Sequence, residues 1–217
     1  MQFKLFDLGL VDFQTAWNIQ KSLHLQVRHK QLFSALILCQ HKPVITLGRK
    51  SKQENILVKA AELKKLDIKT YEIERGGDVT YHGPGQLCVY PIVNLFYFKK
   101  DINWFLRSLE ALLLEVLSEF RIKGVSPPDF TGIWIKREKI ASIGIAIKNW
   151  ITFHGLSLNV KKDDLANFSL IRPCGLDIIM TSMETALKKE VKINKVKEVL
   201  TRRWYETSNF ARIRRGH

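Results

Sequence analysis

The chain has 217 residues, 46% of them hydrophobic and 26% charged, and its 35 Lys and Arg against 21 Asp and Glu give a formal net charge of +14. This composition is typical of a globular protein and excludes a disordered chain. No apolar run reaches the roughly 20 residues that a transmembrane helix needs. The first residues also lack the pattern of a signal or transit peptide. We therefore expect a cytoplasmic protein without a membrane partner, folded as one domain over residues 1–217.

Helical and strand patterns alternate loosely along the chain. Apolar spacing predicts helices around residues 16–27, 59–66, 102–120 and 192–207, and the third of these has the clearest apolar stripe and a capping residue in Asp101. Strands are predicted at residues 34–39, 44–47, 69–73, 87–93, 132–136, 140–147 and 151–160, of which the last three read as a β-meander. The expected fold class is therefore α/β (α+β), a mixed sheet with packed helices.

The positive charge is concentrated near the C-terminus. Ten of the 35 basic residues, but only three of the 21 acidic ones, fall within the basic helix and tail at about residues 186–217. Such a segment attracts an acidic partner, either nucleic acid or an acidic protein, or it is a solvated surface with no partner. Charge alone does not distinguish these three cases.

The stretch from Arg75 to Gln86 is the most unusual in the sequence. Four of the chain's 12 glycines fall within ten positions of it, just before an apolar strand. Adjacent glycines let a backbone approach a ligand and expose its N–H groups. Because neither G-x-x-x-x-G-K-[ST] nor G-x-G-x-x-G is present, we do not expect a nucleotide-binding loop. The stretch is either a substrate-binding loop or a tight structural turn.

Small residues fall at matching positions on two neighbouring predicted strands. Ser142 and Gly144 on one strand and Gly155 and Ser157 on the other would leave a narrow apolar groove, since larger side chains would fill that space. The alternative is that small residues let the long helix pack closely on the sheet.

The three cysteines differ in their surroundings in the sequence. Cys39 and Cys88 lie within apolar strand patterns, so we expect them to be small core residues. Cys174 follows Pro173 and precedes Gly175, and a loop of this kind presents a thiol that is either reactive or structural. An odd number of cysteines without C-x-x-C spacing, and histidines without H-x-H or H-x-x-x-H spacing, argue against disulfides and a metal site.

Four blocks of the sequence resemble the octanoyltransferases of lipoate biosynthesis, the lipoyl(octanoyl) transferases. In chain order the blocks are R-G-G-D-V-T-Y-H-G-P-G-Q-L, K-I-A-S-I-G-I, F-H-G-L-S-L-N-V and P-C-G-L. The resemblance extends from residue 8 to residue 182 and leaves the basic tail uncovered. It departs from the family at Ser142, where alanine is usual, and at Arg172, where an apolar residue is more common.

This resemblance implies the α/β fold of biotin and lipoate protein ligases and an acyltransferase activity. The octanoyl (or lipoyl) group would pass from the phosphopantetheine thioester of acyl carrier protein to a lysine. That lysine would belong to a lipoyl domain of a 2-oxoacid dehydrogenase E2 subunit or to the glycine cleavage H protein. Cys174 is implied as the acyl-thioester nucleophile and Lys139 as its activating partner. The residues implied to contact the acyl substrate are Arg75, Gly76, Gly77, Asp78, Val79, Thr80, Tyr81, His82, Ser142, Ile143, Gly144, Gly155, Leu156 and Ser157.

The chemistry of these residues agrees with the implied reaction. Exchange of one thioester for another is nearly isoenergetic and aminolysis of a thioester is downhill, so we expect no ATP, no metal and no other cofactor. A cation beside a thiol favours the thiolate, and a lysine that loses its proton can act as acid and base in the two half-reactions. Backbone N–H groups of the glycine-rich stretch could hold the developing oxyanion.

Two other functions stay open from the sequence. An ATP-dependent lipoate-protein ligase on the same fold would use Lys139 to bind an acyl-adenylate and would not need Cys174. A nucleic-acid-binding module would use the basic tail with aromatic residues such as Trp204 and Tyr205, but it has no reason to carry all four blocks in this order. We therefore expect no nucleic-acid partner. The expected partner of the basic surface is the acidic acyl carrier protein, through Lys188, Lys189, Lys192, Arg202, Arg203, Arg214 and Arg215.

Overall fold

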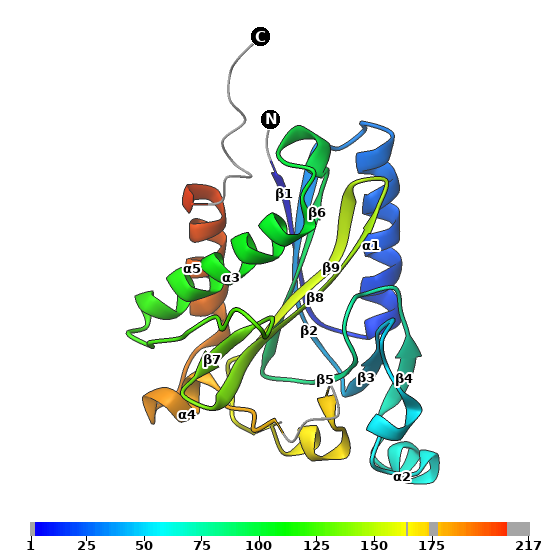
Figure 1. The fold of residues 1–217 in the computed structure, drawn as a ribbon, viewed down its shortest axis with the longest axis vertical. Helices are drawn as coiled ribbons and strands as arrows, with labels where there is room; N and C mark the ends of the chain where they lie inside the picture. The colour runs from blue at the N-terminus through cyan, green and yellow to red at the C-terminus, as the bar shows by residue number, and fades with distance from the viewer. Residues whose placement is uncertain (1–2, 164, 174–177, 208–217) are drawn as a thin grey trace.

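The computed structural model describes residues 3–163, 165–173 and 178–207, which form two β-sheets with helices around them (Figure 1). The larger sheet has six strands in the order β1-β2-β6-β9-β8-β7, and the smaller has three in the order β4-β3-β5. The pairs β1/β2 and β3/β4 are parallel and the other pairs are antiparallel. The expected mixed α/β architecture is therefore confirmed.

The elements have the following bounds. The strands are β1 (Phe3–Val11), β2 (Ser34–His41), β3 (Val44–Leu47), β4 (Lys69–Glu72), β5 (Val79–His82), β6 (Gln86–Val93), β7 (Ile133–Ile135), β8 (Glu138–Lys148) and β9 (Ile151–Asn159). The helices are α1 (Phe13–Arg28), α2 (Ala60–Lys65), α3 (Ile102–Glu119), α4 (Met183–Leu187) and α5 (Ile193–Thr207). Short 3-10 turns occur at Gln53–Asn55, Leu95–Tyr97 and Leu165–Leu170.

Alternation along the central strands supplies both faces of the large sheet with apolar side chains. On β2, Leu36 and Leu38 belong to the core under α3 and α5, whereas Ile37 and Cys39 belong to the core under α1. Figure 1 shows α1 on one side of this sheet and α3 with α5 on the other. A sheet covered on both faces accounts for the nearly continuous apolar sequence of its central strands.

The long helix α3 forms as its sequence pattern predicts. The Asp101 carboxylate accepts the N–H of Trp104 at 3.0 Å and so caps the helix start. Leu109, Leu113 and Leu117 of its apolar stripe are fully buried. None of the described helices is both long and apolar enough to cross a bilayer.

The structure corrects the sequence-based elements in three places. The stretch from Arg75 to Gln86 is not all loop, because residues 79–82 form β5 against β3. The strands at residues 34–39 and 44–47 exist, but they belong to different sheets. Strand β1 was not predicted. Its pairing with β2 shifts register between Asp7 and Leu10, and Gly9 has φ +61°, so a bulge interrupts the alternation that signals a strand.

Candidate active site

A cleft of about 500 Å³ opens beside the glycine-rich stretch. One wall is made by residues 75–80 and another by β8, from Lys139 to Ile145. The start of α3 adds apolar side chains through Ile102 and Leu106. Further lining residues are Lys50, Asp129, Phe130, Thr131, Trp134, Phe168, Pro173, Ile178 and Met180. The cleft thus combines an apolar lining with a few charged groups, as small-molecule sites commonly do.

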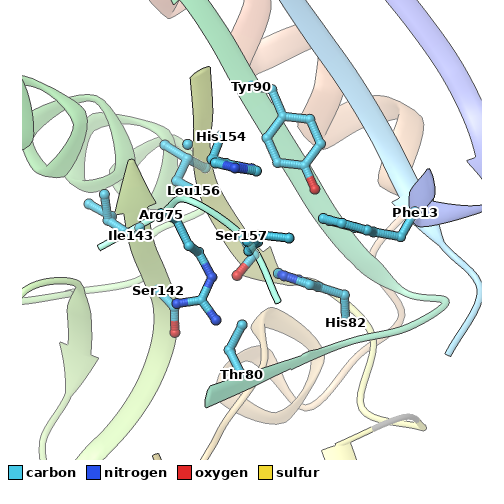
Figure 2. A pocket seen from close by; sticks show the side chains of 13 residues that line it. Phe13, Arg75, Thr80, His82, Tyr90, Ser142, Ile143, His154, Leu156 and Ser157 are labelled. Atoms are coloured by element: carbon cyan, nitrogen blue, oxygen red, sulfur yellow. The ribbon is translucent and has the colours of Figure 1, made fainter. Parts of the chain in front are cut away.

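A smaller inner cavity of about 50 Å³ lies next to this cleft. Figure 2 shows its lining side chains, which come from α1, β5, β6, β8 and β9 and from the segment before the glycines. Residues that line only the inner cavity are Phe13, Ile73, His82, Tyr90, His154, Gly155, Leu156 and Ser157. Residues that line both spaces are Arg75, Thr80, Ser142, Ile143 and Gly144. The two spaces therefore adjoin each other at Arg75 and β8.

Arg75 lies at the boundary between the two spaces and is 7% exposed. Its guanidinium donates to the Thr46 carbonyl at 2.7 Å and to the Thr46 hydroxyl at 3.0 Å, and it also reaches the Gly76 carbonyl at 3.1 Å. A Cβ on Gly144 would lie 2.9 Å from the Arg75 Cδ. The absent side chain at position 144 thus makes room for Arg75. Gly144 also lines both spaces, and its contact with the acyl chain stays a prediction.

The paired small residues of β8 and β9 meet as predicted, and Gly155 also allows a close strand approach. Ser142 lies opposite Ser157, and Gly144 lies opposite Gly155. A Cβ on Gly155 would overlap the Val89 carbonyl oxygen of β6. Glycine is therefore required here for the close approach of two strands, and Gly155 also lines the inner cavity.

The histidines of the inner cavity are neutral near pH 7. Burial lowers the pKa of His82 to about 3, and its Nδ1 lies 2.6 Å from the Gln86 Oε1. Burial also lowers the pKa of His154, although its Nε2 lies 3.2 Å from a Glu74 carboxylate oxygen. The same hydrogen bond lowers the pKa of Glu74 to about 2. Arg75 is therefore the cation among the described groups that line the inner cavity.

Lys139 is the second residue of β8 and is half-buried in the cleft wall. Its Nζ lies 5.4 Å from the centroid of the Trp134 ring. Its backbone is held on both sides, because its N–H donates to the Ile179 carbonyl at 2.8 Å and its carbonyl accepts the Thr181 N–H at 2.9 Å. The lysine at the candidate site is therefore fixed by a short ladder to residues 179–181.

The three cysteines are placed differently. Cys39 and Cys88 are fully buried on paired strands, which confirms the prediction that they are core residues. Burial raises the pKa of Cys88 to about 12 and that of Cys39 well above its usual range. Cys174 lies outside the described residues. Its preceding neighbour Pro173 lines the cleft, and so does Ile178, the next described residue.

Most of the predicted substrate-contact residues line one of the two spaces, but Tyr81 does not. It is 1% exposed and packs edge-on against Phe168, on the face of β5 opposite to Thr80 and His82. In contrast, Phe13, Tyr90 and His154 line the inner cavity without having been predicted. Only His154 had a sequence signal, since it lies within the F-H-G-L-S-L-N-V block. Within the described part of the chain, no three or more His, Cys, Asp or Glu side chains are placed to hold a metal ion.

Comparisons with known proteins agree on one family. The family model for the lipoyl protein ligase A/B catalytic domain matches residues 12–204. The octanoyltransferase of Gloeobacter violaceus is 44% identical over 79% of this chain and 75% of its own. The octanoyltransferase of Caldicellulosiruptor saccharolyticus is 42% identical over 90% of this chain and 84% of its own.

Solved structures show the same fold at low sequence identity. A bi-partite lipoate protein ligase from Thermoplasma acidophilum aligns with a TM-score of 0.74 at 18% identity, over 95% of this chain and 84% of that chain. The biotin protein ligase from Aquifex aeolicus aligns with a TM-score of 0.54 at 11% identity, over 95% and 69%. The family match, the relatives and the fold together show that this chain belongs to the lipoyl protein ligase A/B catalytic-domain family and, within it, to the octanoyltransferases.

Proposed function

We propose that this acyltransferase moves an octanoyl group in two steps, with Cys174 as nucleophile. In the first step the Cys174 sulfur attacks the carbonyl carbon of octanoyl acyl carrier protein, the carbon–sulfur bond to the phosphopantetheine breaks, and the carrier leaves as a thiol. In the second step the amine of a lysine on a lipoyl domain attacks the Cys174 thioester. An amide forms and the Cys174 thiol is released.

The observation that carries this proposal is the meeting of three elements at one cleft. The glycine-rich stretch, Lys139 and the segment that ends at Pro173 all line it, although they are far apart in the sequence. A cysteine next to Pro173 and a cation on β8 are the pair that thiolate chemistry needs. Cys39 and Cys88 do not compete for the role, because burial keeps both as neutral thiols.

Lys139 has two tasks in this mechanism. As an ammonium it favours the Cys174 thiolate and gives its proton to the phosphopantetheine sulfur as the carrier leaves. In the second step, as the resulting neutral amine, it accepts the proton that the attacking lysine loses. It also supplies positive charge near the developing oxyanion. Two backbone N–H groups of the glycine-rich stretch are already engaged within the protein. The Gly76 N–H already donates to the Ile145 carbonyl at 2.9 Å, and the Val79 N–H donates to the Asp78 carboxylate at 2.7 Å.

The acyl chain would occupy the cleft between the glycine-rich stretch, β8 and the start of α3. Ile102, Leu106, Ile143 and Met180 give this space apolar walls. Burial of each methylene contributes roughly 0.8 kcal/mol, so an apolar wall selects for chain length. The reaction draws its driving force from the thioester, so no ATP and no metal enters the proposed steps.

Intact-mass measurement after incubation with octanoyl acyl carrier protein tests the covalent step. We expect one added octanoyl group on the full chain, lost on treatment with hydroxylamine and absent from Cys174→Ala. Cys39→Ser and Cys88→Ser should still form the adduct. An active Cys174→Ala variant would overturn the mechanism.

An ATP-dependent ligase on the same fold is the second candidate. It would make octanoylated lipoyl domain from free octanoate and ATP, with no adduct on Cys174. Running the same assay with octanoate and ATP in place of the carrier thioester separates the two functions. We expect product from the carrier thioester only.

A further inference from the structure

A chain of buried amide side chains runs from the inner cavity to the segment beside Lys139. The Gln86 amide nitrogen donates to the Asn159 Oδ1 at 2.9 Å, and the Asn159 amide nitrogen donates to the Thr181 carbonyl at 3.0 Å. Asn159 and Thr181 are 2% exposed and Gln86 is 5% exposed. None of these three residues lines the cleft or the inner cavity, yet their hydrogen bonds connect residues that do.

The direction of these hydrogen bonds follows from the Thr181 carbonyl at one end, which can only accept. A backbone carbonyl only accepts, so the group of Asn159 that faces Thr181 is its NH₂ and the group that faces Gln86 is its oxygen. The NH₂ of Gln86 then faces Asn159, and its Oε1 accepts the Nδ1–H of His82 at 2.6 Å. Each member is thus held in one orientation.

This row of hydrogen bonds ends at the backbone segment that holds Lys139. Ile179 and Thr181 bracket Lys139 with two backbone hydrogen bonds, and Met180 pairs with it as a parallel bridge. Two residues of this segment, Ile178 and Met180, line the cleft. The amide of Asn159 donates to the Thr181 carbonyl and so ties this short ladder to the end of β9.

We propose that Asn159 is a positioning residue for the transfer reaction. It holds residues 179–181 against Lys139, and thereby sets where the lysine side chain and the following cleft wall stand relative to the acyl carbonyl. This inference rests on the proposed role of Lys139. Loss of the amide donor leaves the buried Thr181 carbonyl without that hydrogen bond, so the segment and Lys139 shift before the fold as a whole is lost.

Two variants of Asn159 test the proposal. Asn159→Asp keeps the acceptor for Gln86 and, when ionised, lacks the donor to Thr181, whereas Asn159→Leu removes both. We expect each to lower kcat for octanoyl transfer by about tenfold or more, while KM for octanoyl acyl carrier protein stays within about twofold. A positioning effect lowers kcat, because the bound substrate is unchanged and the lysine is misplaced.

Thr152→Val is the matched control. Thr152 lies near the other end of β9, is fully buried, and donates to the Pro91 carbonyl at 2.7 Å while accepting the Val93 N–H at 2.9 Å. It lies about 23 Å along the strand from Asn159 and lines neither space. We expect a loss of thermal stability comparable to that of the Asn159 variants, with kcat within about twofold of the parent chain.

Three outcomes overturn the proposal, and a fourth separates it from the proposed function. An Asn159→Leu variant with kcat near that of the parent chain overturns it, and so does a Thr152→Val variant that loses as much kcat. If Asn159 variants do not fold, hydrogen exchange of the parent chain decides. The Thr181 amide, which donates to the Lys139 carbonyl, should exchange as slowly as the amides of β8, and its exchange at loop rates overturns the inference. An active Lys139→Ala variant, assayed in parallel, would instead refute the proposed role of Lys139.

Discussion

Lys139 and Cys174 are 35 positions apart in the sequence, and their proposed pairing is tested most directly through thiol reactivity. An unperturbed thiol has a pKa of about 8.5, and a neighbouring ammonium lowers it. Alkylation of Cys174 should therefore proceed below that pH in the parent chain and shift to higher pH in Lys139→Ala. Peptide mapping over a pH series gives the profile for Cys174 alone, since Cys39 and Cys88 are buried with raised pKa values.

Lys139→Arg separates charge from proton transfer. Arginine keeps the positive charge but does not release a proton at accessible pH. The variant should retain part of the low-pH alkylation of Cys174 while losing most of its turnover. Near-native kcat in Lys139→Arg would show that the lysine acts only through its charge.

A side chain at position 144 is expected to disturb the packing of Arg75. In Gly144→Ala the new Cβ would meet the Arg75 Cδ at 2.9 Å and the Gly76 carbonyl at 3.2 Å. We expect a loss of about 1–3 kcal/mol in the free energy of unfolding, measured with urea, because the side chain is overpacked. Gly76→Ala is the stability control, since its Cβ would meet only the Ile145 carbonyl, at 3.7 Å. Equal stability of the two variants would contradict this reading of Gly144.

At the scale of elements, the basic helix α5 is less available to a partner than its charge implied. Arg202 and Arg203 both pair with Glu119 at the end of α3. That end lies about 26 Å along the helix from Ile102, which lines the cleft. Lys50, which is exposed, lines the cleft itself. Arg214 and Arg215 lie outside the described residues.

We therefore expect acyl carrier protein to depend more on Lys50 than on Arg202. Lys50→Glu should raise KM for the carrier severalfold at low salt, and the effect should shrink at physiological salt, where the Debye length is about 8 Å. Arg202→Glu should have a smaller effect on KM, with kcat little changed. Steady-state kinetics across a salt series measures both. A larger effect at Arg202 would place the carrier on α5.

At the scale of the whole molecule, buried histidines make the fold sensitive to acid. Burial lowers the pKa of His82 to about 3 and that of His41 to about 4, both below the unfolded value of 6.5. Between each lowered pKa and 6.5, the unfolded chain therefore binds more protons than the folded chain. The contribution of these buried neutral rings to the free energy of unfolding is complete above pH 6.5. It is lost as the pH falls toward 4, by about 1.4 kcal/mol per pH unit for each ring.

Urea unfolding at pH 7, 6 and 5 checks this pH dependence. The free energy of unfolding should fall on acidification, and His41→Gln should flatten the fall by about 1.4 kcal/mol per pH unit between pH 6 and pH 5. The same slope in the parent chain and in His41→Gln would show that His41 is not buried as a neutral ring.

Local patterns of the sequence determined the family and most elements of this protein. The stripe of α3 and its cap at Asp101, the meander of β7 to β9, and the buried Cys39 and Cys88 are all confirmed. These features depend on spacings of a few residues, which the sequence contains directly. The four motif blocks identified the octanoyltransferase family because their order in the chain is specific.

Only the tertiary structure decided which distant residues meet, and for what purpose. It divided β2 and β3 between two sheets, placed Arg75 in the space beside Gly144, and brought Phe13, Tyr90 and His154 together in the inner cavity. It also joined Gln86 through Asn159 to the backbone that holds Lys139. The physical reason is that these contacts arise from the packing of strands and loops distant in sequence, where close approach and burial select partners that local spacing does not encode.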